Sequence, residues 1–182
     1  MQIFIMRHGE AENTVVEDSL RALTKEGVNE TKKMGVWLAK QDLSTINIFV
    51  SPFIRAQQTC DNIMLALNNV KFDKKIQQET IELITPSGNA KQMHNFMDGF
   101  FDDMNSQINS DAEDSQAVLL ISHMPFVSFL VGELTDSLYM PIFSTGAIIV
   151  IDYDIEKMQG KIIEMVSPEK LSNQCELLVK GV

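Results

Sequence analysis

Residues 1–11, MQIFIMRHGEA, join a short apolar run to a basic dipeptide and a polar turn. The run at 2–6, QIFIM, is typical of a buried strand, because it is short, continuous and bounded by polar residues. Arg7 and His8 follow it directly, at the expected carboxyl end of that strand. Such a pair is either a solvated strand end or part of a binding or catalytic site, and the rest of the chain decides between these interpretations.

The chain continues as strands alternating with helices. Apolar runs predict further strands over 46–52 and 117–122. Apolar positions at helical spacing predict helices over 25–40, 55–69 and 90–108, and another over 124–135 with Pro125 in its first turn. The remaining segments are an irregular loop at 9–23, a strand or extended loop at 75–89, an acidic loop at 109–116, an antiparallel hairpin formed by 146–154 and 160–167, and a weakly patterned tail.

This order of elements predicts an α/β protein. We expect a three-layer sandwich around a mostly parallel sheet, with the C-terminal hairpin adding antiparallel strands. No repeat, low-complexity linker or domain boundary interrupts the chain, so residues 1–182 are expected to form a single domain.

Composition excludes several classes of function. The formal net charge is −10, which argues against nucleic-acid binding, because that needs basic surface. The two cysteines have neither a CxxC pattern nor metal-type spacing, so no disulfide framework is expected. No aspartate–histidine cluster has metal-ligand spacing, and we expect neither a bound metal nor a cofactor. The sequence shows no signal peptide and no apolar run of membrane-spanning length, which predicts a cytoplasmic location without membrane contact.

Basic and imidazole side chains follow three of the expected strand ends. Arg7 and His8 follow the first strand, Arg55 opens the helix after the second, and His123 follows the strand at 117–122. Because the carboxyl ends of parallel strands share one sheet edge, these groups are expected to converge there, beside helix N-termini, as a phosphate site. Taken singly, each has a plainer explanation: Arg55 as a polar residue of a first helical turn, and His123 as a histidine packed under the sheet. His94 lies in a helix, away from any strand end, and is expected to be structural.

Four segments carry a resemblance to a known family: RHGEA (7–11), LTKEG (23–27), SPFIRAQQT (51–59) and LLISHMP (119–125). In order and spacing they resemble the histidine phosphatase superfamily, which has the phosphoglycerate mutase-like fold, and within it the bacterial phosphohistidine phosphatases. The resemblance implies that His8 is the nucleophile and is transiently phosphorylated. It implies that Arg7 and Arg55 hold the phosphoryl oxygens, that His123 is the second histidine of the site, and that Arg21 is a further phosphate-binding arginine.

The sequence departs from the wider superfamily in its proton donor. Mutases and acid phosphatases of the superfamily carry a carboxylate between the second helix and the fourth strand, where this chain has a short segment with only Glu79 and Glu82 near the strand end. An alkoxide leaving group needs that proton, whereas a phosphohistidine can lose its imidazole as a neutral ring.

The resemblance and the missing acid together favour one function. We expect a protein phosphohistidine phosphatase whose partner is a histidine-containing phosphotransfer domain or a phosphocarrier protein. The alternatives are a small-molecule phosphomonoesterase that uses Glu82 as its acid, and a non-catalytic phosphate-binding module. Intact His8 disfavours the last, because a pure binder needs no nucleophile.

Overall fold

The computed structural model of the chain describes residues 1–13, 17–69, 75–107 and 116–172. Its described strands form a six-stranded sheet in the order β3-β2-β4-β1-β5-β6. Their bounds are β1 Gln2–Arg7, β2 Thr45–Val50, β3 Lys75–Thr80, β4 Gln116–Ser122, β5 Ile148–Asp154 and β6 Gln159–Val166. Strands β1 to β4 run parallel to one another, β5 pairs antiparallel with β1, and β6 pairs antiparallel with β5, so the expected mixed sheet is confirmed.

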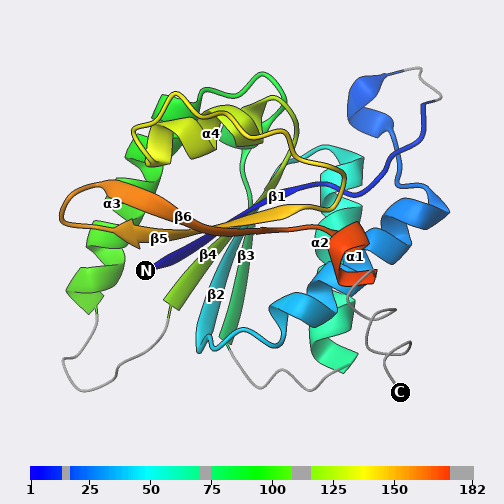
Figure 1. Cartoon of the computed structure of the whole chain (residues 1–182), viewed down its shortest axis with the longest axis horizontal. Helices are drawn as coiled ribbons and strands as arrows, with labels where there is room; N and C mark the ends of the chain where they lie inside the picture. The colour runs from blue at the N-terminus through cyan, green and yellow to red at the C-terminus, as the bar shows by residue number, and fades with distance from the viewer. Residues whose placement is uncertain (14–16, 70–74, 108–115, 173–182) are drawn as a thin grey trace.

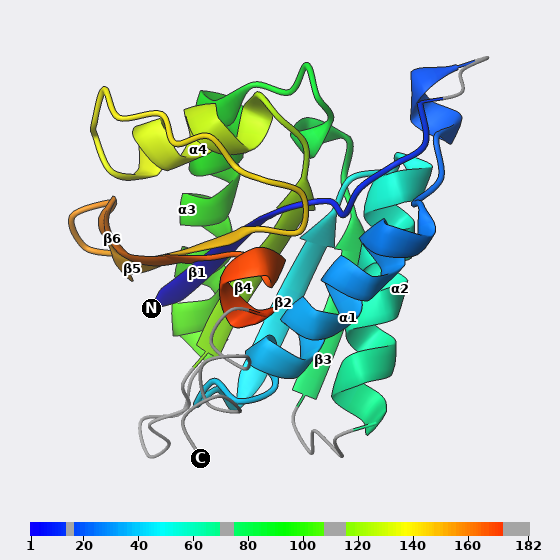
Figure 2. The ribbon, with the colours of Figure 1, turned by 45° about the vertical axis from the view of Figure 1, so that its right-hand side comes forward.

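Helices cover both faces of this sheet. They are α1 (Lys25–Leu38), α2 (Ile54–Asn69), α3 (Ala90–Gln107) and α4 (Phe126–Leu134), with 3₁₀ turns η1 (Asp18–Leu20) and η2 (Glu82–Ile84). Figure 1 and the turned view in Figure 2 show α1 and α2 on one face and α3 and α4 on the other. The three-layer α/β sandwich expected from the sequence is therefore confirmed.

A hydrophobic core lies on each face of the sheet, because successive side chains of the central strands point to opposite faces. On β1, Phe4 and Met6 face α1 and α2, while Ile3 and Ile5 face α3 and α4. All four side chains are almost completely buried. A strand buried on both faces reads as a continuous apolar run, which is why QIFIM was recognisable in the sequence.

Several boundaries differ from the sequence expectations. The segment 9–23, expected to be an irregular loop, contains η1 and a bridge between Ala11 and Leu23. The ambiguous segment 75–89 is a strand, β3, followed by η2. Pro125 is the N-cap residue of α4 and lies just before its first turn, not within it. The acidic loop, apart from Gln116, and most of the C-terminal tail lie outside the described residues.

The sheet order places the three strand ends named in the sequence side by side. Strand β4 lies between β1 and β2 and is parallel to both. In this register Arg7 is opposite Ser122, and Val50 is opposite Ile121. The carboxyl ends of the three strands are therefore level, which brings the residues after them to one edge of the sheet.

Two helical glycines test the packing of the layers. Gly35 of α1 faces α2, and a Cβ there would lie 2.6 Å from Cβ of Ala66. Gly99 of α3 is exposed, and a Cβ there would meet nothing within 4 Å. We expect Gly35→Ala to lower the free energy of unfolding by about 1–3 kcal/mol through overpacking. We expect Gly99→Ala to raise it by roughly 0.5–1 kcal/mol, because alanine has the higher helix propensity.

Urea unfolding of the two variants beside the wild type measures both changes. The variants are matched, since each adds one methyl group to a helix. A stabilisation by Gly35→Ala would contradict the close approach of α1 to α2, and a destabilisation by Gly99→Ala would contradict the open surroundings of Gly99 on α3.

Candidate active site

The candidate site begins where β1 ends. The backbone of His8 is held from both sides: its N–H donates to the carbonyl of Ser122 over 2.9 Å, and its carbonyl accepts from the N–H of Gly146 over 3.1 Å. Gly9 follows where the chain passes close to α1, and a Cβ on it would lie 2.6 Å from the carbonyl oxygen of Gly27. The glycine after His8 is therefore required by this close approach.

The orientation of the His8 ring assigns its two nitrogens. Nδ1 lies 2.6 Å from the carbonyl oxygen of Gly9, which can only accept, so Nδ1 carries the proton. Nε2 accordingly has the lone pair, and it accepts a hydrogen bond from Nε of Arg55 over 3.1 Å. The side chain is buried, so a lone pair is aimed at the guanidinium inside the site.

His123 completes a pair of imidazoles. Its ring centroid lies 5.0 Å from that of His8, and its Nε2 lies 2.7 Å from Oγ of Ser51 at the end of β2. Phe53 lies on another side of the ring, with centroids 5.0 Å apart. Nδ1 of His123 is buried and has no hydrogen-bond partner among the described residues. A buried, unpaired ring nitrogen is the kind of atom that a bound ligand satisfies.

Both imidazoles are held neutral. Burial, reinforced by the charges of Arg55, Arg7 and Arg21, lowers the pKa of His8 to about 4, although the bond to the Gly9 carbonyl opposes the shift. Burial, followed by the neighbouring His8 and Arg55, lowers the pKa of His123 to about 2. A neutral His8 is nucleophilic, since protonation would remove the lone pair on Nε2.

Two arginines flank the imidazoles. Nη1 of Arg7 donates to the carbonyl of Phe143 over 2.7 Å, while its Nε is buried with no partner among the described residues. Burial lowers the pKa of Arg7. Arg55 stands at the start of α2, with its guanidinium 5.0 Å from the ring centroid of Phe53 and its Nε on His8. The site therefore presents guanidinium groups around a neutral nucleophile, which suits a phosphoryl group.

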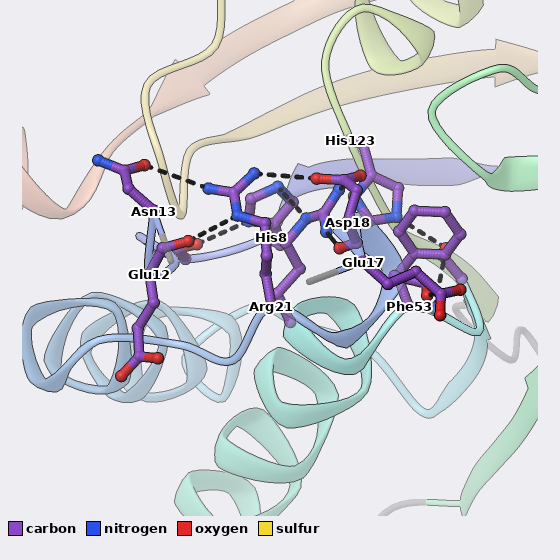
Figure 3. A network of polar contacts seen from close by, with 12 residues as sticks. His8, Glu12, Asn13, Glu17, Asp18, Arg21, Phe53 and His123 are labelled. Atoms are coloured by element: carbon purple, nitrogen blue, oxygen red, sulfur yellow. Dashed lines mark hydrogen bonds and ion pairs between the residues drawn. The ribbon is translucent and has the colours of Figure 1, made fainter. Parts of the chain in front are cut away.

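Arg21 joins the cluster through Asp18, as Figure 3 shows. Its Nη1 donates to Oδ1 of Asp18 over 3.1 Å, and its Nε donates to the carbonyl of Glu12 over 2.6 Å. The other carboxylate oxygen, Oδ2, accepts from Nη2 of Arg55 over 2.9 Å. The bonds to Arg55 and Arg21 lower the pKa of Asp18 although its desolvation opposes the shift, so the carboxylate is ionised at neutral pH.

Two polar groups of this site, Asp18 and Ser51, are not among the site residues predicted from the sequence. Ser51 was visible as the residue ending the second apolar run, but nothing marked it as a partner of His123. Asp18 precedes Arg21 by three residues inside the segment expected to be irregular. That Asp–Arg spacing is the one available signal, and it is common on surfaces.

The carboxylates considered as proton donors lie outside this network. Glu82 is exposed on η2, and Glu79 is exposed on β3. Within the described ranges, neither makes a hydrogen bond or ion pair with the two imidazoles or the three arginines. Ser122 ties η2 to the sheet edge, because its Oγ donates to the carbonyl of Ile84 over 2.6 Å. His94 is not brought into the cluster, since its Nε2 lies 2.7 Å from the hydroxyl of Tyr153.

The described part of the chain offers neither a metal-binding cluster nor a membrane-spanning helix. It contains no group of three or more histidine, cysteine, aspartate or glutamate side chains arranged to hold a metal ion. None of its helices has the length and apolar character needed to cross a membrane.

A parallel-sheet edge carrying a neutral histidine among arginines defines a protein that binds and transfers phosphoryl groups. Comparison with known proteins agrees. A sequence profile of the histidine phosphatase superfamily (branch 1) matches residues 3–79. The phosphohistidine phosphatase SixA of Escherichia coli (strain K12) is 33% identical over 168 residues, which cover 92% of this chain and 94% of that protein.

Two more comparisons extend the match. A SixA homologue of Haemophilus influenzae is 37% identical over 142 residues, covering 74% of this chain and 77% of that protein. The solved structure of SixA complexed with tungstate superposes with a TM-score of 0.79 at 33% identity, over 94% of this chain and 99% of that one. The chain therefore belongs to the histidine phosphatase superfamily, as a homologue of the SixA phosphohistidine phosphatases.

The lowered histidine pKa values are directly measurable, because the chain has only three histidines. In an NMR titration of the free protein, we expect the His8 and His123 rings to remain neutral at pH 5.5, where an ordinary imidazole is mostly protonated. His8 should take up its proton only as the pH falls through about 4. Spectra of His8→Gln and His123→Gln assign the signals. A midpoint near 6.5 for either ring would contradict the burial described above.

Proposed function

We propose that the protein is a phosphohistidine phosphatase, a hydrolase that removes phosphate from a histidine side chain of another protein through a phosphorylated His8. The observation that carries the proposal is the His8 ring: its Nδ1 is tied to the Gly9 carbonyl and its Nε2 faces Arg55. The sequence likeness to enzymes named phosphohistidine phosphatases supports the substrate class. We further propose that residues 1–182 are one catalytic domain, since the described strands belong to one sheet.

In the first step, Nε2 of His8 attacks the phosphorus of the substrate phosphohistidine, forming one P–N bond while the other breaks. Arg7 and Arg55 hold the phosphoryl oxygens, with His123 and Arg21 as further donors, so that attack is in line. The substrate ring, whose second nitrogen carries a proton, leaves as a neutral imidazole. His8 keeps its proton on Nδ1, which donates to the Gly9 carbonyl throughout, and this bond stabilises the positive charge that develops on the phosphorylated ring.

In the second step, water attacks the phosphorus, the P–N bond to His8 breaks, and both water protons depart with the phosphate as H₂PO₄⁻. His8 returns to the neutral state with its proton on Nδ1. Since an imidazole is the leaving group in both steps, neither step requires a separate general acid. An alkyl phosphate would lose an alkoxide and need a proton in the first step, and among the described residues neither Glu79 nor Glu82 is bonded to the site, which supports a phosphohistidine substrate.

For the partner, we propose a histidine-containing phosphotransfer domain or a phosphocarrier protein. Such proteins present the phosphohistidine on their own surface. The cluster described here reaches the surface at the side of Asp18 and Arg21, whose side chains are 54% and 23% exposed. A phosphohistidine carried by another protein is thus a fitting substrate for it.

The first test of this function concerns His8. We expect His8→Ala to abolish turnover of a phosphorylated phosphotransfer domain, since the nucleophile is lost, while the central sheet still folds. Rapid quenching of the wild type with a ³²P-labelled substrate should trap acid-labile phosphate on the protein. His94→Gln, a change at the histidine bound to Tyr153, is the matched control and should keep its activity. Turnover at wild-type rate by His8→Ala would refute the mechanism.

The second test concerns the leaving group. General acid catalysis is worth about 10²–10⁴-fold, so without it alkyl phosphates should fall behind phosphohistidine and aryl phosphates by roughly that factor in kcat/KM. We expect Glu82→Gln to change turnover of phosphohistidine little, because the exposed carboxylate makes no bond to the site.

Glu79→Gln serves as its control, since it removes an equal charge from the neighbouring strand. The measurement is kcat/KM of the wild type and both variants on a phosphorylated phosphotransfer domain and on an alkyl phosphate. A large loss for Glu82→Gln alone on both substrates would identify Glu82 as a general acid and favour the small-molecule phosphomonoesterase.

A further inference from the structure

The Asp18 carboxylate lies where a phosphoryl group would be expected to bind. Nε and Nη2 stand on the same edge of a guanidinium, the edge that binds two oxygens of a carboxylate or a phosphate. In Arg55 this edge donates from Nε to Nε2 of His8 over 3.1 Å and from Nη2 to Oδ2 of Asp18 over 2.9 Å. An anion that approaches His8 and uses this edge must therefore replace the carboxylate.

The same carboxylate also binds the second arginine. Its Oδ1 accepts from Nη1 of Arg21 over 3.1 Å. Asp18 thus bridges Arg55 and Arg21 with one oxygen on each, as two oxygens of a phosphoryl group would. Figure 3 shows the Asp18 carboxylate and the Arg21 guanidinium joined in this network.

The carboxylate can leave without releasing Arg55. The side chain of Asp18 is 54% exposed, whereas that of Arg55 is 4% exposed. Nη1 of Arg55 also donates to the backbone carbonyl of Asp18, and its guanidinium lies over the Phe53 ring. Rotation of the Asp18 side chain toward solvent breaks the bonds to the carboxylate and leaves these two anchors in place.

The charges decide which anion prevails. A carboxylate has one negative charge and two oxygens, whereas a phosphoryl group has up to two charges and three oxygens. The phosphoryl group can bond to both arginines and still present an oxygen to the unpaired Nε of Arg7 or Nδ1 of His123. A weak, singly charged anion gains none of these additional bonds, so it does not displace the carboxylate.

From this arrangement we propose that Asp18 is an internal competitor that occupies the Arg55–Arg21 pair in the free enzyme, so that only a phosphoryl group binds well and the product phosphate is readily expelled. The proposal rests on the proposed function, because it assigns the substrate phosphoryl group to these arginines. It makes Asp18 a determinant of specificity and product release, with no bond formed or broken at its own atoms.

The test is anion affinity, measured by calorimetry with inorganic phosphate and with tungstate. We expect Asp18→Asn and Asp18→Ala each to bind both anions about tenfold more tightly than the wild type, the size of one charge-assisted hydrogen bond. The inhibition constant of phosphate in turnover assays should fall by the same factor. Both variants lose the carboxylate charge but differ in side chain, so a change in affinity shared by the two is due to the lost charge.

Glu17→Gln is the matched control. It removes an equal charge from the adjacent residue, whose carboxylate accepts only from Ser19 among the described contacts. Weaker anion binding by both Asp18 variants would overturn the proposal, because the carboxylate would then position the arginines for the substrate. The proposal would also be overturned if the anion affinity of the Asp18 variants rose no more than that of Glu17→Gln. If the wild type binds neither anion, the proposed function itself fails, so the two failures are distinguishable.

Discussion

The parallel pairing of β4 with both β1 and β2 is the constraint on which the site depends. It makes the ends of three strands level, and each end is followed by a residue that the site uses. The backbone bond from His8 to the Ser122 carbonyl continues this pairing one residue beyond the strands. The distance between the two imidazoles is therefore set by the spacing of adjacent strands, which is among the least variable dimensions in proteins.

Burial of the two imidazoles then provides the chemistry. Placing histidines beside arginines in a desolvated site favours their neutral form, and the Gly9 carbonyl selects the tautomer of His8. The arginines cannot lose their charges so easily, and they bond instead to backbone carbonyls and to Asp18. The same surroundings thus keep the His8 ring neutral, with its Nε2 lone pair free of a proton, while the arginines keep the anion site positively charged.

The sequence allowed prediction of the parts of the site that follow apolar strands. His8, Arg55 and His123 each stand at or soon after the end of such a run, and the parallel alternation implied their convergence. Strand β3 could not be separated from a loop, because KIQQET is polar and largely exposed at the edge of the sheet. Asp18 could not be assigned, since its role depends on a tertiary contact with Arg55 from a segment without periodicity.

One hydroxyl joins the nucleophile to its arginine. Oγ1 of Thr59 accepts from the N–H of Gly9 over 3.1 Å and donates to the carbonyl of Arg55, one turn earlier in α2, over 2.7 Å. The path from His8 to Arg55 therefore passes through a single side chain, independently of the long route through the sheet. Since His8 is also anchored to the sheet, a shift of α2 along its axis would have to break one of the two bonds of this hydroxyl before it could draw Arg55 away from the nucleophile.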